Sequence, residues 1–418
     1  MEAIPSDSLK RLARRALTAV CLFALTGCES MLNRSLYVAV PHVEQTAQYD
    51  TDSVEVSDYA MLLRVLREQV RAGAEQVTLR FSSYEGDVEA AVAEAVGELV
   101  YDDAYGQFVE ASLIPDIRDK LVTVNIRYRR GRPREQIDAL RNVSSSGGLQ
   151  TELRTILFTF SPYAALELRY GAPEDLDPAE MLEAIYLRTP LYALGFPRVT
   201  STFYRGSRGA SVILELELEF AADADTLTDR SAEAGRRIGE LAGLADPELD
   251  APELALQLYD IVCGYIEYDH QEAEQAAAAE ADRLARPYSM LGAMLDGRAV
   301  GEGYALAYKA LCDEFQIPCE VVTGWLGGNV HAWNILQLDG EWYMADAAAD
   351  SQSGQDDRAR FLGTDEAWLD ARYTWDAARY PACDSAALTY DLISGRLRVP
   401  DPDPGPGPEP DTNPDPGP

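Results

Sequence analysis

The sequence predicts an α+β protein, in which an N-terminal α/β region of two β-α-β units precedes a second α+β domain. Strand-like and helical segments alternate twice between residues 51 and 222. Farther along, a helical run that opens near Gly301 is followed by two β-rich runs that flank an Asp-Gly turn. The length of 418 residues leaves room for two or three domains.

The first 27 residues have the pattern of an export signal. Four basic residues precede an apolar stretch, residues 16–25, which is too short to span a bilayer. The sequence Leu-Thr-Gly-Cys at 25–28 resembles the lipobox of bacterial lipoproteins, which implies cleavage before Cys28 and lipidation of its thiol. We therefore expect an extracytoplasmic protein anchored to the cell membrane through Cys28, with residues 28–50 as a tether. The alternative is a plain secretory peptide with an incidental cysteine.

Residues 51–135 and 151–222 each place a helix between two strands. In the first unit the strand, helix and strand are expected at 76–81, 88–100 and 121–128, and in the second at 166–170, 178–185 and 211–220. We interpret these units as a duplication. The stretch 136–150, which contains Asn-Val-Ser-Ser-Ser-Gly-Gly, is expected to be a linker. No catalytic constellation occurs in residues 28–222, so we expect a binding or spacer region there.

Three glutamates alternate with apolar residues along the last of these strands. Glu215, Glu217 and Glu219 resemble a cation site, but alternation alone places polar residues on the solvated face of a sheet. We therefore predict a solvated sheet face at these positions.

The chain is strongly acidic, with a formal net charge of −34. Removing the signal changes this to about −36, because residues 1–27 carry a net +2. Such a surface repels phosphate backbones, so we expect no nucleic-acid partner. The 3 His and 6 Cys show no metal-ligand spacing, so we expect no metal and no cofactor. Cys312 and Cys319 are either a disulfide at a helix-to-strand corner or two buried thiols.

One block of the chain, residues 299–346, carries a specific resemblance. It reads A-V-G-E-G-Y-A-L-A-Y-K-A-L-C-D-E-F-Q-I-P-C-E-V-V-T-G-W, followed by H-A-W-N-I-L-Q-L-D-G-E-W-Y-M-A-D. This block resembles the transglutaminase-like superfamily, which implies a papain-like α+β fold with a Cys-His-Asp triad. We expect the domain to extend over 223–398, and the Pro/Asp-rich residues 399–418 to form a disordered tail.

The geometry of the second half of this block follows from the turn. Asp339-Gly340 between two β-rich runs predicts a two-residue hairpin, which pairs Leu338 with Glu341. This register places Asp346 diagonally across from His331 on the same face of the sheet. A carboxylate there accepts a hydrogen bond from the imidazole and fixes its tautomer.

The position where the resemblance implies a nucleophilic cysteine is occupied by Gly301, which has no side chain. Cys312 lies eleven residues later, about 16 Å along a helix axis, and fits better as a core residue. Glu302 is the nearest side chain, but no metal-ligand set accompanies it to activate water. Besides His331 and Asp346, we expect Trp333, Glu302, Tyr304 and Asn334 to line the cleft.

Three functions remain open from the sequence. The first is an inactive transglutaminase-like protein whose cleft binds a peptide, a cell-wall fragment or a protein. The second is an active acyltransferase or cysteine peptidase that uses His331 and Asp346 with an unrecognised nucleophile. The third is a structural protein of the cell envelope.

Overall fold

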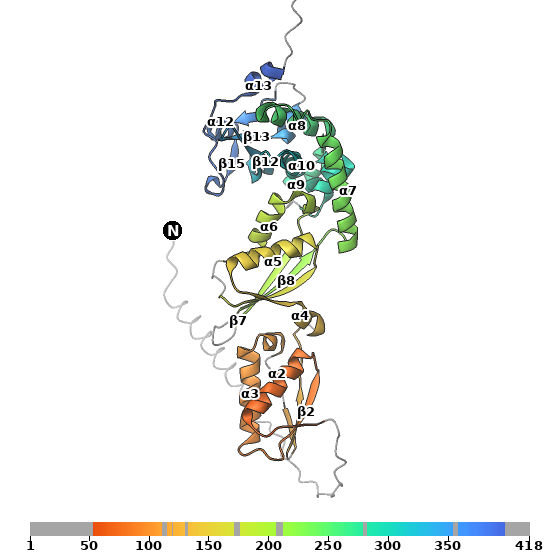
Figure 1. Cartoon of the computed structure of the whole chain (residues 1–418), viewed down its shortest axis with the longest axis vertical. Helices are drawn as coiled ribbons and strands as arrows, with labels where there is room; N and C mark the ends of the chain where they lie inside the picture. The colour runs from red at the N-terminus through yellow and green to blue at the C-terminus, as the bar shows by residue number, and fades with distance from the viewer. Residues whose placement is uncertain are drawn as a thin grey trace, which may run out of the picture. The chain divides into compact units, whose positions relative to one another are not determined.

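The computed structural model describes residues 53–397, except for 111–114, 119, 130–132, 171–175, 206–211, 279–281 and 354–357. The expected signal, the tether with Cys28 and the C-terminal tail lie outside these residues. Within the described part of the chain, no helix is long and apolar enough to cross a membrane. The structure confirms the α+β class, with three main sheets that are flanked by helices (Figure 1).

The first sheet has the strand order β1-β2-β4-β3 and its own hydrophobic core. Its elements are β1 (Val54–Glu55), α2 (Tyr59–Arg71), β2 (Gln76–Arg80), α3 (Val88–Asp102), β3 (Pro115–Arg118) and β4 (Leu121–Asn125). Aspartates begin both helices: Asp58 accepts from the Met61 amide, and Asp87 accepts from the amides of Glu89 and Ala90. The apolar faces of α2 and α3 pack on the sheet.

The second sheet has the same topology, with the order β5-β6-β8-β7. Its elements are α4 (Pro133–Ala139), β5 (Leu140–Val143), α5 (Ser146–Phe158), β6 (Tyr163–Leu168), α6 (Pro178–Arg188), β7 (Arg198–Arg205) and β8 (Val212–Glu219). In each sheet the first two strands are parallel and the others pair antiparallel. This shared topology supports the predicted duplication, which stays a prediction.

The predicted strand pairs differ from the observed ones in direction. The strands around α3 and α6 were expected to form β-α-β units, but β2 pairs antiparallel with β4, and β6 with β8. An additional strand, β3 or β7, lies between them in sequence and reverses the chain. The β-α-β crossovers between neighbouring strands run through α2 and α5, from the short strands β1 and β5. Helices α3 and α6 instead lead to β3 and β7, which are parallel to β2 and β6 but separated from them by β4 and β8.

The expected linker at 136–150 was wrong, because this stretch carries regular structure. It contains most of α4, all of β5 and the first turn of α5. Its serines and glycines start a helix: the Ser145 side chain accepts a hydrogen bond from the Gly148 amide at 3.1 Å. β5 pairs in parallel with β6.

The expectation of a solvated face was wrong for Glu215, which is only 1% exposed. Three donors surround its carboxylate: the Gln136 amide at 3.1 Å, the Tyr163 hydroxyl at 2.7 Å and the Tyr204 hydroxyl at 2.7 Å. Helix α4 covers this part of the sheet, so the strand is buried on both faces here. Glu219, at the end of the same strand, is exposed as expected.

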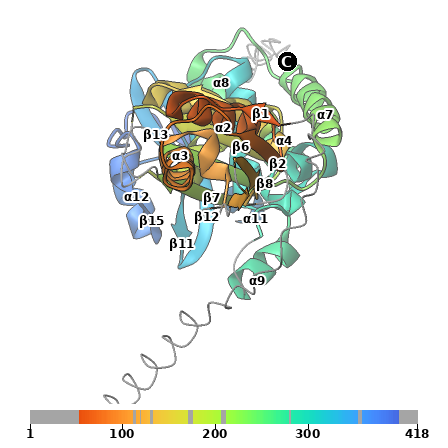
Figure 2. The same cartoon turned by 90° about the horizontal axis from the view of Figure 1, so that it is seen from below.

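The third part of the chain contains the five-stranded sheet β14-β13-β12-β11-β15. Its strands are β11 (Cys319–Leu326), β12 (Asn329–Leu338), β13 (Glu341–Ala345), β14 (Phe361–Gly363) and β15 (Tyr373–Trp375), and a separate pair is β9 (Glu267–Tyr268) with β10 (Arg298–Ala299). The helices are α7 (Ala224–Ala242), α8 (Ala251–Tyr265), α9 (His270–Ala278), α10 (Gly301–Glu314), α11 (Ala347–Ser353), α12 (Asp365–Asp370) and α13 (Tyr390–Leu397). Figure 2 shows β11, β12, β15 and α12 from below.

Helix α10 is the centre of this region, and every residue from Gly301 to Cys312 is buried. It packs on β11 and β12, where the Asn334 side chain donates to the Ala305 carbonyl at 2.9 Å. The opposite face of the sheet has a separate aromatic core that includes Trp333, Trp368 and Tyr373. The core around α10 is continuous with that of the second sheet, because residues from Val143 to Leu218 contribute to one hydrophobic core with the third part of the chain.

Candidate active site

The dyad predicted from the hairpin register is present. Asp339 and Gly340 both have positive φ, 52° and 87°, as a primed two-residue turn requires, and Leu338 pairs with Glu341. This register brings the end of β13 beside β12. His331 Nε2 and Asp346 Oδ2 lie 2.6 Å apart, within hydrogen-bonding distance.

Asp346 is held from three directions and is only 1% exposed. Besides His331, the Tyr373 hydroxyl donates to Oδ2 at 2.7 Å, and the Ala349 amide at the start of α11 donates to Oδ1 at 3.0 Å. Burial alone would raise the pKa of this carboxyl, but His331 and these hydrogen bonds outweigh it and hold the pKa below 3.8. Asp346 is therefore an ionised, fixed partner for the imidazole. Sequence reasoning did not find Tyr373, because it lies on a short strand 27 residues later.

The other ring nitrogen of His331 faces Gly301, the first residue of α10. A Cβ atom built at position 301 would lie 2.6 Å from both Nδ1 and Cε1 of this ring, and 3.0 Å from the Ala332 carbonyl oxygen. Real Cβ atoms do not approach other atoms so closely. The imidazole therefore packs directly against the glycine, in space that any larger residue would need.

The cysteines among the described residues lie elsewhere and are free thiols. Cys312 is a core residue, as expected, and Cys319 is buried as well. Burial raises the pKa of Cys312 well above its ordinary value, and that of Cys263 and Cys383 to about 12. A thiol with a raised pKa is a poor nucleophile, because the thiolate is the reactive form.

A cavity of about 400 Å³ opens beside the dyad. Gly301, Glu302, Thr323, Val330 and His331 are among the residues that line it. The cavity therefore lies at the N-terminus of α10 and beside the turn that joins β11 to β12.

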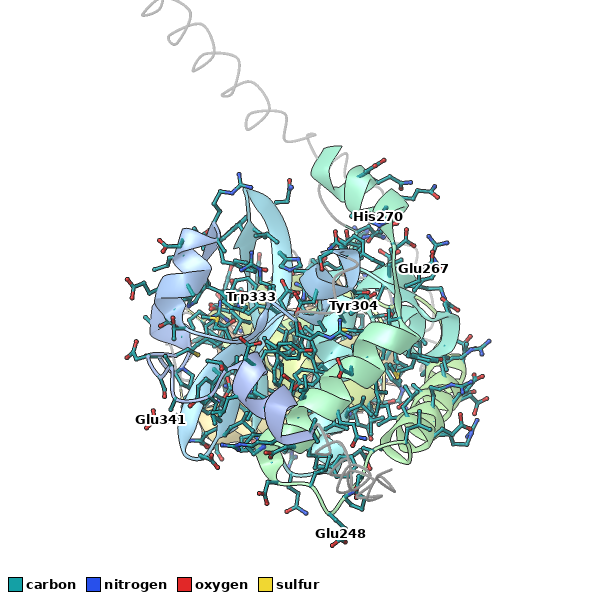
Figure 3. The ribbon with its side chains drawn as sticks, turned by 90° about the horizontal axis from the view of Figure 1, so that it is seen from above. Glu248, Glu267, His270, Tyr304, Trp333 and Glu341 are labelled. Atoms are coloured by element: carbon teal, nitrogen blue, oxygen red, sulfur yellow. The ribbon has the colours of Figure 1, made fainter. Side chains whose placement is uncertain are left out.

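Three of the residues expected in the cleft do not line this cavity. Trp333, Tyr304 and Asn334 are each 1% exposed. Trp333 lies in the aromatic core on the other face of the sheet, and the Tyr304 hydroxyl donates to the Ile266 carbonyl. Figure 3 shows Trp333 and Tyr304 in the interior, whereas Glu341 lies at the periphery. Proximity in sequence to the dyad did not distinguish lining residues from supporting ones.

Glu302 lines the cleft, but its carboxylate is already paired. The Arg283 guanidinium donates to both of its oxygens, each at 2.9 Å, and also pairs with Glu183 of α6. Burial raises the pKa of Glu302, and the charge of Arg283 opposes this rise. Because both oxygens are engaged, Glu302 is poorly placed to activate water. Sequence reasoning missed Arg283, which lies just outside the motif block.

No group of three or more His, Cys, Asp or Glu side chains suited to a metal ion occurs within the described ranges. The dyad itself presents an oriented imidazole. It can accept or donate a proton, or bind a polar group, at Nδ1.

Replacing Gly301 with alanine should destabilise the protein. The added methyl group would push the imidazole away from Asp346, so we expect the free energy of unfolding to fall by about 1 to 3 kcal/mol. The control is Gly239→Ala in α7, where a Cβ meets nothing within 4 Å. That change should raise stability by about 0.5 to 1 kcal/mol. Equal stabilisation by both substitutions in urea titrations would contradict the close packing of His331.

Replacing Asp346 with asparagine should lower the free energy of unfolding by about 3 kcal/mol near neutral pH, because the buried His331 and Tyr373 side chains lose the ionised acceptor of their hydrogen bonds. Because the pKa of Asp346 is lowered in the folded protein, the stability that its ionised carboxylate contributes is fully present above pH 3.8, the ordinary pKa of the group. This stability is lost as the pH falls through the lower pKa of the folded state. The difference in the free energy of unfolding between the variant and the wild type, measured by urea unfolding at several pH values, should therefore become smaller in acid. Asp339→Asn in the hairpin turn is the control and should change stability little. A difference that does not depend on pH would contradict an ionised Asp346.

Residues 239–347 match the family described as the transglutaminase-like superfamily. The chain is also similar to a solved structure described as a TGase, at 12% identity and a TM-score of 0.28, over 71% of this chain and 82% of that one. A candidate cysteine protease from Cytophaga hutchinsonii matches at 14% identity and a TM-score of 0.22, over 36% of this chain and 62% of that one. No protein of curated function matches. Residues 239–347 therefore form a transglutaminase-like domain.

Proposed function

We propose that this is a lipid-anchored extracytoplasmic protein whose transglutaminase-like domain binds a peptide, a cell-wall fragment or a protein and does not catalyse acyl transfer. The observation that carries the proposal is Gly301 at the N-terminus of α10, with the His331 imidazole packed against it. The anchoring part of the proposal rests on the lipobox-like residues 25–28.

Acyl transfer by a Cys-His-Asp triad begins with attack of a thiolate on the amide carbon. Here the base and its orienting carboxylate are in place at 2.6 Å, but the attacking atom is missing. In triads of this kind, loss of any one member lowers the rate by several orders of magnitude. An oriented imidazole without a nucleophile can still hydrogen-bond to an amide or carbonyl group of a ligand.

The surroundings of the cavity favour ligand binding. Val330 lines it and is 72% exposed, and Trp325, directly opposite on β11, is 49% exposed. An exposed apolar side chain in a cleft that also holds polar groups, next to a second exposed apolar side chain, is typical of a binding site. An extended chain with an apolar side group fits this combination.

An active acyltransferase or peptidase is the second candidate. It requires a nucleophile near His331, yet Cys263, Cys312 and Cys383 are thiols with raised pKa values, and none of them lines the cavity. A purely structural role in the envelope is the third candidate. A structural role predicts that the cavity beside His331 binds no peptide, cell-wall fragment or protein.

Binding can be tested by NMR on the uniformly labelled protein. Addition of acetyl-Gln-Gly-amide or a cell-wall stem tetrapeptide should give saturable shifts at Gly328, Val330 and His331, because these residues line the cavity. Val330→Asp should weaken binding about tenfold, since it removes the burial of one apolar side chain.

The matched control is Leu244→Asp. Leu244 is also an exposed apolar residue, 66% exposed, but it does not line the cavity, so this change should leave the affinity unaltered. Absence of shifts with both ligands would refute the binding function and favour the structural one.

A further inference from the structure

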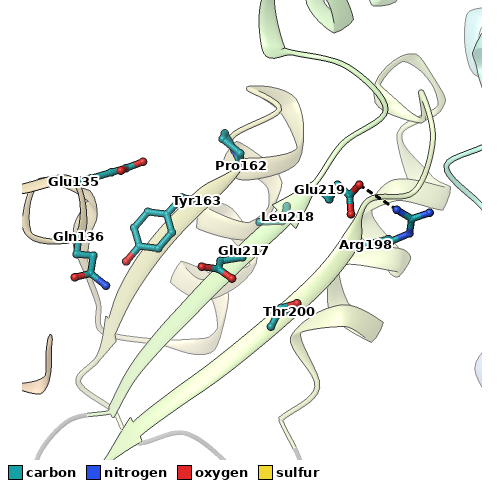
Figure 4. Close-up of a pocket in the computed structure, with 9 residues that line it drawn as sticks. All are labelled: Glu135, Gln136, Pro162, Tyr163, Arg198, Thr200, Glu217, Leu218 and Glu219. Atoms are coloured by element: carbon teal, nitrogen blue, oxygen red, sulfur yellow. Dashed lines mark hydrogen bonds and ion pairs between the residues drawn. The ribbon is translucent and has the colours of Figure 1, made fainter. Parts of the chain in front are cut away.

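The second sheet ends in an open edge, which is formed by β7. In the strand order β5-β6-β8-β7 this strand pairs with β8 alone, in continuous register over all eight of its residues. Figure 4 shows β7, with Thr200, on the side of β8 that faces away from Tyr163 of β6. Apart from its ladder with β8, the backbone of Val199–Phe203 has no hydrogen bond to any part of the chain that the structure describes. One side of β7 is therefore open to another strand.

The hydrogen bonds of β8 determine which backbone groups of β7 face this open side. The Leu218 amide donates to the Pro162 carbonyl at 2.9 Å, so even-numbered residues of β8 bond towards β6 and odd-numbered ones towards β7. The odd-numbered residues of β8 lie opposite even-numbered residues of β7. Even-numbered residues of β7 therefore bond to β8, whereas Val199, Ser201 and Phe203 direct their N–H and C=O groups to the open edge.

The edge of β7 lacks the features that protect sheet edges from pairing. Natural edge strands are kept short, or they carry proline or charged side chains. The other terminal strands of the described sheets have two to four residues, and β3 begins with Pro115. In contrast, β7 has eight residues, and Val199–Phe203 contains no charge, proline or glycine. Its composition of valine, threonine, serine and phenylalanine is typical of a segment that pairs with another strand.

We propose that β7 pairs with β7 of a second copy of this chain, as antiparallel strands about a two-fold axis through Ser201. A two-fold axis perpendicular to the sheet keeps the same face of both copies on one side. In this register Val199 of one copy lies opposite Phe203 of the other, and Ser201 lies opposite Ser201. The outward N–H and C=O groups of all three residues then have partners. This inference does not depend on the function of the dyad.

The side chains of the strand are compatible with this self-pairing. Val199 and Phe203 are only partly buried against the core, so placing them opposite each other covers more of their apolar surface. On the other face of the sheet Thr200 lies opposite Thr202. Pairs of an aromatic with a β-branched residue, and of two threonines, both stabilise neighbouring strands. Arg198 falls opposite an uncharged tyrosine, so the register brings no two like charges together.

The first test is the mass of the full chain in solution, measured by analytical ultracentrifugation over a series of protein concentrations. We expect a dimer whose fraction rises with concentration. Because each copy carries a net charge of −34, added salt should screen the repulsion and strengthen the association between about 0.05 and 0.5 M NaCl. A chain that stays monomeric at about 0.1 mM protein in the higher salt would overturn the proposal.

Substitutions at Ser201 test whether β7 forms the interface. Ser201→Lys places two ammonium groups opposite each other in the dimer, so it should weaken the association by about tenfold or more. Ser201→Thr is the matched control, because it leaves the strand uncharged, and it should not weaken the association. Ser201 is exposed, so both variants should keep the circular dichroism spectrum of the wild type. Equal dimerisation of Ser201→Lys and the wild type would overturn the proposal.

Hydrogen exchange of the wild-type amides tests the register without a substitution. When the protein concentration is raised through the dimerisation range, exchange at Val199, Ser201 and Phe203 should slow by about tenfold or more, because these amides are open in the monomer. The amides of Thr200 and Thr202 already bond to β8 and should change much less. Equal slowing at all five positions, or a dimer with no slowing at the three outward amides, would contradict this pairing.

Discussion

The hydrogen bond between His331 and Asp346 is the interaction on which the site depends. It joins two strands at their open ends, and it requires the Asp339-Gly340 turn, the Tyr373 hydroxyl from β15 and the Ala349 amide of α11. Burying an ionised carboxylate is costly unless such partners surround it. The chain therefore provides a complete support for the imidazole, whose ring packs directly against Gly301.

The sequence predicted this dyad because the underlying rules are local and strict. A two-residue Asp-Gly turn fixes the register of both strands, and the register decides which side chains share a face. The start of α10 at Gly301 was expected from the resemblance to a family and not from such a local rule. The residues that line the cavity could not be predicted in the same way. Trp333 and Asn334 lie within the motif but point into two different cores, and Arg283 reaches Glu302 from outside it.

The N-terminal region shows where patterns in the sequence fail. Strands β1 and β5 have two and four residues, which is too short to show the alternation of apolar and polar residues that identifies a strand. The parallel pairs of β1 with β2 and of β5 with β6 were therefore not predicted. Serine and glycine at 144–148 are typical of a loop and equally typical of the start of a helix, which is what they form. Glu215 occupies a polar position in the alternating pattern of its strand, as a solvated residue would, but α4 covers it. Burial by a distant segment is not encoded in the strand that it covers.

The central claim is that the dyad lacks a nucleophile and does not catalyse acyl transfer. The most direct measurement is release of ammonia from a glutamine peptide and a primary amine in the presence of the wild-type protein. Because Gly301 offers no attacking atom, ammonia should not rise above the level without protein. Ammonia release by the wild type that is abolished in a His331→Ala variant would contradict the account.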